Sequence, residues 1–158
     1  MKKNITEQEA LQRLTGLCAT AEHCTQEMLE KLQKWEIPDD AQARIMQHLI
    51  NNKYIDEERY CRAFVNDKIR YSKWGRRKIE QALFMKHIDK AIQRQVLDGI
   101  DPAEYIAVLR PMLQQKRKST KAANTYEMNQ KLLRFAMQRG FTMDIIRQCM
   151  EVDDEADW

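Results

Sequence analysis

The sequence is short of the residues that interrupt helices. Its 158 residues include only 4 glycines and 3 prolines, whereas Leu, Met, Ala, Gln, Glu, Lys and Arg, which favour helices, are frequent. This composition therefore predicts an all-α protein.

Long apolar segments are also missing. No run approaches the roughly 20 apolar residues that cross a bilayer, and no signal peptide precedes the first expected helix. From the sequence we expect a cytoplasmic protein with no membrane partner.

Motifs for catalysis are absent as well. The sequence has no Gly-rich phosphate loop, no His-Glu-x-x-His motif and no carboxylate pair outside capping and solvent positions. Its three histidines, His23, His48 and His87, are scattered. His87 stands where a helix should end, and His tolerates a positive φ better than most residues, so it indicates a helix end rather than a base. We expect no enzyme and no cofactor.

The cysteines are few and not spaced as ligands. Cys18, Cys24, Cys61 and Cys149 form no CxxC pair, and three of them occupy apolar positions of expected helices. Disulfides or a metal site are the alternatives, but reduced core thiols fit a cytosolic chain better. His23 is adjacent to Cys24 rather than spaced as a second ligand. We expect no metal site.

What the sequence does contain is a pattern that occurs three times, at intervals of about 50 residues. Helix-start signals at Thr6, Asp56 and Asp101 open the three segments. Each continues with the same succession of four apolar positions: Met28, Leu32, Ile37 and Ile45; Ile79, Leu83, Ile88 and Val96; Leu132, Ala136, Phe141 and Cys149. A helical unit stacked on its own copies explains this periodicity, and such arrays usually serve as extended binding surfaces.

Each segment is expected to hold three helices. The predicted repeats are residues 1–54, 55–99 and 100–150, followed by an acidic tail at 151–158. We expect Phe64 in the core of the second repeat. The predicted architecture is an array of three tandem three-helix repeats.

Positive charge is concentrated in the middle of the chain. Residues 59–94 carry 11 Lys and Arg against 3 Asp and Glu, whereas residues 1–58 carry 7 against 11 and residues 95–158 carry 9 against 10. Such an asymmetry predicts a partner that presents phosphates or an acidic protein surface.

The densest basic run joins the first two helices of the second repeat. Its candidate partner-binding residues are Lys68, Arg70, Lys73, Trp74, Arg76, Arg77 and Lys78. Gly75 is expected to allow a sharp reversal. Cations in the first turn of a helix oppose its dipole, so we expect an anionic partner to supply the counter-charge, aided by free N–H groups. The alternative is a solvated loop with Trp74 packed on the neighbouring repeat.

A second basic cluster, Lys116, Arg117 and Lys118, is expected between helices of the third repeat. Charge runs between helices are often solvated loops. The alternative is that this cluster lies on the same face as the first and widens it.

Several of these motifs resemble the RecX family, bacterial modulators of the RecA recombinase. Residues 54–64 are similar to the family's hydrophobic-Asp-Asp-x-x-aromatic-Ala pattern, and residues 73–79 to its Lys-Gly-x-x-x-Ile segment. Residues 86–88 resemble its Lys-Gly-Ile, and residues 139–141 its late Arg-Gly-Phe. The departures are Glu57, Cys61 and His87 in place of Asp, Ala and Gly, and an inserted Trp74.

The resemblance implies an elongated, curved array of three tandem three-helix repeats that binds RecA or the RecA–DNA filament along its groove. We also expect a weak direct contact with DNA and a monomeric chain. The resemblance further implies inhibition of the ATPase, coprotease and strand-exchange activities of RecA. The alternative function is a helical protein that binds nucleic acid without sequence preference.

Overall fold

The computed structural model describes the backbone of residues 4–156 and the side chains of residues 4–150. This part of the chain is helical and contains no strand, as the composition predicts. Its helices are α1 (Glu7–Thr20), α2 (Thr25–Lys34), α3 (Asp39–Asn51), α4 (Glu57–Arg70), α5 (Arg76–Met85), α6 (Lys90–Asp98), α7 (Pro102–Ser119), α8 (Thr125–Gln138) and α9 (Met143–Ala156).

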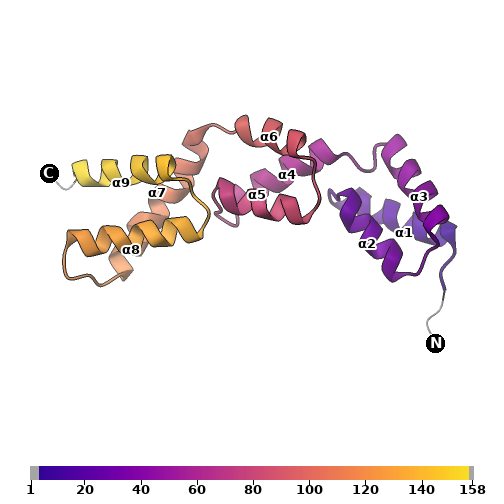
Figure 1. Cartoon of the computed structure of the whole chain (residues 1–158), viewed down its shortest axis with the longest axis horizontal. Helices are drawn as coiled ribbons and strands as arrows, with labels where there is room; N and C mark the ends of the chain where they lie inside the picture. Colours follow the sequence, from indigo (N-terminus) through magenta and orange to yellow (C-terminus); the bar gives the residue numbers. More distant parts are fainter. Residues whose placement is uncertain (1–3, 157–158) are drawn as a thin grey trace.

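The helices form three triplets that follow one another along the long axis of the molecule (Figure 1). We call α1–α3 the first repeat, α4–α6 the second and α7–α9 the third. Helix α9 continues to Ala156, past the expected boundary at residue 150. The last two residues of the expected tail, 157–158, lie outside the described residues.

The three predicted start signals each cap a helix. The side chains of Thr6, Asp56 and Asp101 accept hydrogen bonds from backbone N–H groups at the starts of α1, α4 and α7, at 3.1, 2.9 and 2.9 Å. Each cap satisfies one of the donors that a helix start leaves without an intrahelical partner.

The middle helix of every repeat ends in the same way. Glu36, His87 and Gly140 follow α2, α5 and α8 with φ values of 58°, 58° and 90°. In each case the next residue is buried and its N–H donates to a carbonyl five residues earlier: Ile37 to Leu32, Ile88 to Leu83, and Phe141 to Ala136. This is a left-handed helix end locked by an apolar contact. The prediction for His87 is confirmed.

The predicted repeat register is confirmed by burial. All twelve apolar positions of the three successions are at most 5% exposed. The prediction that Phe64 lies in the core of the second repeat is wrong. Its side chain is half-buried and packs at the edge of the core.

The repeats are joined in two different ways. The second and third repeats share one continuous apolar core, and α4 packs directly on α7. The first repeat has a core of its own, except that its fully buried Cys24 belongs to the core of the second and third repeats. The pair of repeats α4–α9 is therefore one packed body.

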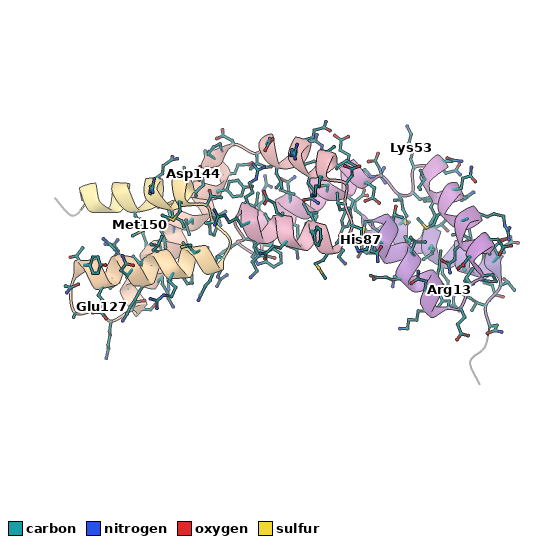
Figure 2. The ribbon with its side chains drawn as sticks, viewed as in Figure 1. Arg13, Lys53, His87, Glu127, Asp144 and Met150 are labelled. Carbon is teal, nitrogen blue, oxygen red and sulfur yellow. The ribbon has the colours of Figure 1, made fainter. Side chains whose placement is uncertain are left out.

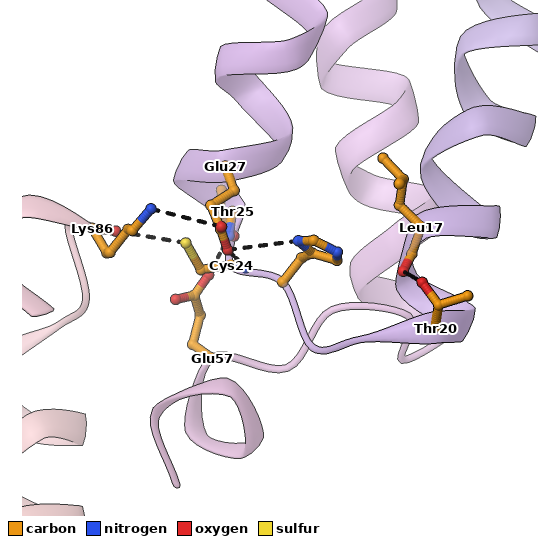
Figure 3. A network of polar contacts seen from close by, with 8 residues as sticks. Leu17, Thr20, Cys24, Thr25, Glu27, Glu57 and Lys86 are labelled. Atoms are coloured by element: carbon orange, nitrogen blue, oxygen red, sulfur yellow. Dashed lines mark hydrogen bonds and ion pairs between the residues drawn. The ribbon is translucent and has the colours of Figure 1, made fainter. Parts of the chain in front are cut away.

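Polar contacts join the first repeat to the second (Figure 3). The Thr25 N–H donates to Glu57 at 2.7 Å, and the ammonium group of Lys86 lies 3.6 Å from Glu27. Nearby, the Arg59 Nε donates to Glu22 at 2.6 Å. His87 lies at the end of α5 near this junction (Figure 2).

Candidate partner-binding site

The predicted basic residues of the second repeat surround the connection between α4 and α5. Two lie in the last turn of α4, two in the connection and three in the first turn of α5: Lys68 and Arg70, Lys73 and Trp74, and Arg76, Arg77 and Lys78. The chain reverses at Lys73, which has a φ of 58°. Gly75 has a φ of −87°, which any residue adopts. The prediction that Gly75 provides the reversal is therefore wrong.

Gly75 serves the close approach of the third repeat instead. A Cβ on Gly75 would come within 2.3 Å of the backbone N and Cα atoms of Phe141. In the same contact, a Cβ on Gly140 would lie 2.5 Å from the backbone N of Lys78. The lack of these two side chains lets the start of α5 touch the turn between α8 and α9.

Two backbone N–H groups at the start of α5 are used inside the protein. The Gly75 N–H donates to the Arg139 carbonyl at 2.8 Å, and the Arg77 N–H donates to the Gly140 carbonyl at 3.0 Å. These carbonyls also favour the positive end of the helix dipole. The prediction that the N–H groups of this turn await an anionic ligand is therefore wrong for Gly75 and Arg77.

Arg76 is likewise neutralised within its own repeat. Its Nε donates to Glu80 at 2.7 Å and its Nη2 donates to Asp98 at 2.6 Å. The hydrogen bond to Glu80 and the contact with Asp98 raise the pKa of Arg76 above its ordinary value. The expectation that a partner supplies the counter-charge is therefore wrong for Arg76.

The alternative predicted for Trp74, packing on the neighbouring repeat, is what the structure shows. Its half-buried ring packs against the shared core of the second and third repeats. The ammonium groups of Lys68 and Lys78 lie 5.0 and 4.8 Å from the ring centroid. Because a cation is attracted to an aromatic face, the ring holds both charges in place at the surface.

Beside this connection lies an open groove of about 730 Å³ between the second and third repeats. Tyr71 and Lys73 line it from the α4–α5 connection, Lys116 from α7, and Phe135 and Arg139 from the end of α8. The groove thus brings together residues from both basic clusters.

The second basic cluster is not a loop. Lys116, Arg117 and Lys118 lie in the last turn of α7, where the negative end of the helix dipole favours cations. The predicted position between helices is wrong. Lys116 lines the groove with Lys73, whereas Lys118 is exposed to solvent.

Phe135 repeats the arrangement seen at Trp74. The ammonium group of Lys116 and the guanidinium group of Arg139 lie 5.1 and 5.2 Å from its ring centroid. Sequence reasoning missed Phe135 and Arg139. Their spacing of four residues places them on one helix face, but the approach of Lys116 from α7 depends on tertiary packing.

Among the described residues, four cations of this surface have no carboxylate partner, whereas Lys68 beside them lies 3.9 Å from Asp67. Six cations in other places lie 2.6–3.6 Å from a carboxylate: Arg44, Arg59, Arg62, Arg76, Lys86 and Lys131. In the part of the chain that the structure describes, Lys73, Lys78, Lys116 and Arg139 take part in no ion pair. The surface therefore carries positive charge that the chain itself does not neutralise.

The structure shows no metal centre among the described residues. Cys24 and Cys61 are buried thiols without a disulfide, and burial raises the pKa of each to about 11. Both thiols are therefore protonated at neutral pH and poor nucleophiles. None of the described helices has the length and apolar character needed to span a membrane.

Comparison with known families gives two matches in consecutive parts of the chain. Residues 56–97 match the second three-helix domain of RecX, and residues 103–150 match the third. The chain belongs to the RecX family. The matched regions contain the α4–α5 connection and the groove, so the site lies in the part that is shared with the family.

Individual relatives agree with this assignment. The chain is 26% identical over 129 residues to regulatory protein RecX of Finegoldia magna, covering 77% of this chain and 60% of the relative. It is 26% identical over 140 residues to that of Acinetobacter baylyi, covering 89% and 85%. For Staphylococcus carnosus the identity is 28% over 136 residues, covering 84% and 49%. The chain thus spans about half to six-tenths of two of these RecX proteins.

Solved RecX structures share the fold. The crystal structure of RecX from Lactobacillus salivarius superposes with a TM-score of 0.82 at 19% identity, covering 94% of this chain and 96% of that one. A second crystal structure, of regulatory protein RecX, also gives 0.82, at 16% identity, with 92% and 73% covered. The helical repeat architecture is therefore that of RecX proteins.

Proposed function

We propose that this RecX-family chain is a non-enzymatic regulator that binds RecA or its nucleoprotein filament and inhibits the ATPase, strand-exchange and coprotease activities. Its relatives are named regulatory proteins, which supports the regulatory class. The RecA partner is what the resemblance of the sequence motifs implies. We further propose that the chain acts as a cytoplasmic monomer.

The observation that carries this proposal is the unneutralised positive charge around the second and third repeats. Lys78 beside Trp74, and Lys116 and Arg139 beside Phe135, are held over aromatic rings. Fixing the cations before binding lowers the entropy cost of ordering them in a complex. An acidic protein surface would supply the missing counter-charge.

The shape of the chain supports a filament as the partner. The second and third repeats form one packed body, and the first repeat extends the array further along the same axis (Figure 1). An elongated protein of this kind contacts neighbouring subunits at once, and several modest contacts then add up to firm binding.

Direct nucleic-acid binding is the second candidate, favoured by one observation. Tyr71 is 80% exposed at the rim of the groove, beside Lys73. An exposed ring next to a cation suits a stacked base and its phosphate. The proposed regulator and this alternative differ in what they bind at moderate salt.

Binding at increasing salt separates the two functions. Anisotropy of labelled single-stranded DNA reports direct binding, whose affinity falls by about 0.7 log units per contacted phosphate for each log unit of salt. Co-sedimentation with preformed RecA filaments reports filament binding. We expect filament binding to persist at a salt concentration where binding to free DNA has vanished. Loss of both at the same salt concentration would favour the nucleic-acid function.

A further inference from the structure

The groove between the second and third repeats has an apolar lining as well as charged groups. Val108, Pro111 and Met112 of α7 line it together with the cations Lys73 and Lys116. Aliphatic side chains beside unneutralised cations are complementary to a ligand that carries both an apolar group and negative charge.

Pro111 changes the hydrogen bonding of the α7 backbone beside the groove. It lies inside α7, where its ring nitrogen has no hydrogen to donate. The carbonyl of Ala107, four residues earlier, therefore lacks the N–H that an α-helix would provide. Ala107 and Pro111 both line the groove. A main-chain N–H of a bound peptide is a suitable donor for this carbonyl.

We propose that the groove binds an acidic peptide segment of the protein that this chain regulates, a proposal that rests on the function given above. An apolar side chain of the segment packs on Val108 and Met112. Carboxylates on either side meet Lys73, Lys116 and Arg139, and a backbone N–H donates to the Ala107 carbonyl.

The same features disfavour a nucleic-acid strand in the groove. Tyr71 at the rim offers one exposed ring, but the apolar side chains that α7 gives to the groove are aliphatic and provide no flat aromatic faces on which further bases could stack. The ring of Phe135 is already in contact with Lys116 and Arg139. The sugar–phosphate backbone of DNA has no donor for the carbonyl of Ala107, whereas every peptide unit other than that of proline has one.

The first test uses designed probes on the full chain. The binding probe is a fluorescein-labelled peptide of glutamates around one central leucine. Its control has serine in place of the leucine, and labelled oligothymidylate of the same length is the nucleic-acid probe. At moderate salt we expect the leucine peptide to bind about tenfold more tightly than the serine peptide and more tightly than oligothymidylate. Equal binding of the two peptides, or stronger binding of oligothymidylate, would overturn the proposal.

Two matched variants test the cations. Lys73→Gly combined with Lys116→Ala removes two charges, and glycine adopts the φ of 58° at position 73 freely. Lys53→Gly makes the same replacement at an exposed lysine with a φ of 59°, far from the groove in the sequence. We expect the double variant to bind the leucine peptide at least about tenfold more weakly and Lys53→Gly to bind it normally. Equal affinities of the double variant and of Lys53→Gly for the leucine peptide would contradict the proposal.

Pro111→Ala tests the backbone acceptor. Alanine restores the N–H that pairs with Ala107, so the variant should melt at a higher temperature and yet bind the leucine peptide more weakly. A variant that melts at a higher temperature but binds the leucine peptide with unchanged affinity would show that the Ala107 carbonyl takes no part in peptide binding. If the leucine peptide binds as expected while RecA activity is unaffected by this chain, the proposed function fails and the groove assignment stands.

Discussion

Gly75 and Phe141 touch through their backbones, across the boundary between the second and third repeats. A Cβ on Gly75 would lie 2.3 Å from the N and Cα atoms of Phe141, and the N–H of Gly75 donates to the carbonyl of Arg139 at 2.8 Å. This contact fixes the α4–α5 connection against the end of α8. It therefore also fixes the cations on both sides of the groove.

Gly75→Ala should separate these two repeats. The added methyl group has no room beside the Phe141 backbone, so we expect a loss of about 1–3 kcal/mol in the free energy of unfolding. Gly16→Ala is the matched control, because Gly16 is exposed in the interior of α1 and a Cβ there would meet no atom within 4 Å. That change should stabilise the chain by about 0.5–1 kcal/mol. Urea titration measures the free energy of unfolding of both variants. Equal changes in the two variants would contradict the close contact between Gly75 and Phe141.

His87→Gly should stabilise the chain. His87 has a φ of 58° at the end of α5, and the equivalent position in the third repeat is Gly140. Because glycine adopts this conformation without a Cβ penalty, we expect a gain of about 1 kcal/mol. Thermal melting of His87→Gly beside His87→Ala tests this, since alanine should give no gain. A lower melting temperature for the glycine variant would rule out the helix end described above.

The polar junction between the first and second repeats depends on Arg59. Its side chain donates to Glu22 at 2.6 Å and to the carbonyls of Lys53 and Tyr54 at 3.0 and 3.3 Å. Arg59→Leu should therefore loosen the first repeat, which small-angle scattering would detect as a wider range of shapes. Arg62→Leu removes the exposed pair with Glu58 within α4 and should leave the scattering curve unchanged. Identical curves for the two variants would refute this role of Arg59.

Stability should fall in alkaline solution. Burial raises the pKa of Cys24 and Cys61 from 9.0 to about 11. The unfolded state then loses these protons at a lower pH than the folded state, so the stabilisation is complete below pH 9.0 and is lost as the pH rises towards about 11. Buried Tyr60 and Tyr105, with their pKa values raised above 10.0 for the same reason, extend the decline.

Urea unfolding at a series of alkaline pH values, with a reducing agent present, measures this decline. Cys24→Ala combined with Cys61→Ala should lower stability at neutral pH and flatten its pH dependence just above pH 9.0. An unchanged slope in the double variant would show that these thiols are not its source.

The fold was largely predictable because the repeat register is encoded in local patterns. The successions from Met28, Ile79 and Leu132 are buried as predicted, and the caps at Thr6, Asp56 and Asp101 form as predicted. These features depend on helical spacing and on hydrogen bonds between near neighbours. One sequence is enough to reveal them.

The site was predictable only in part because it depends on contacts between repeats. The sequence points to Lys73 and Lys116 as cations but does not show that they line one groove. Arg76 looked equivalent to Lys78 in the same basic run, yet Asp98 of α6 neutralises it. Phe135 belongs to the site because Lys116 of α7 packs over its ring, a contact between two helices that the sequence does not show.

The most direct test of the account is the single-stranded-DNA-dependent ATPase of RecA filaments, titrated with this chain at moderate salt and with RecA from the same source. We predict inhibition by the unaltered chain and by Lys53→Gly, and at least about tenfold weaker inhibition by the variant carrying both Lys73→Gly and Lys116→Ala. Circular dichroism should show that all three are equally helical. No inhibition by the unaltered chain would contradict the proposed function, and equal inhibition by the folded double variant would contradict the role of this surface.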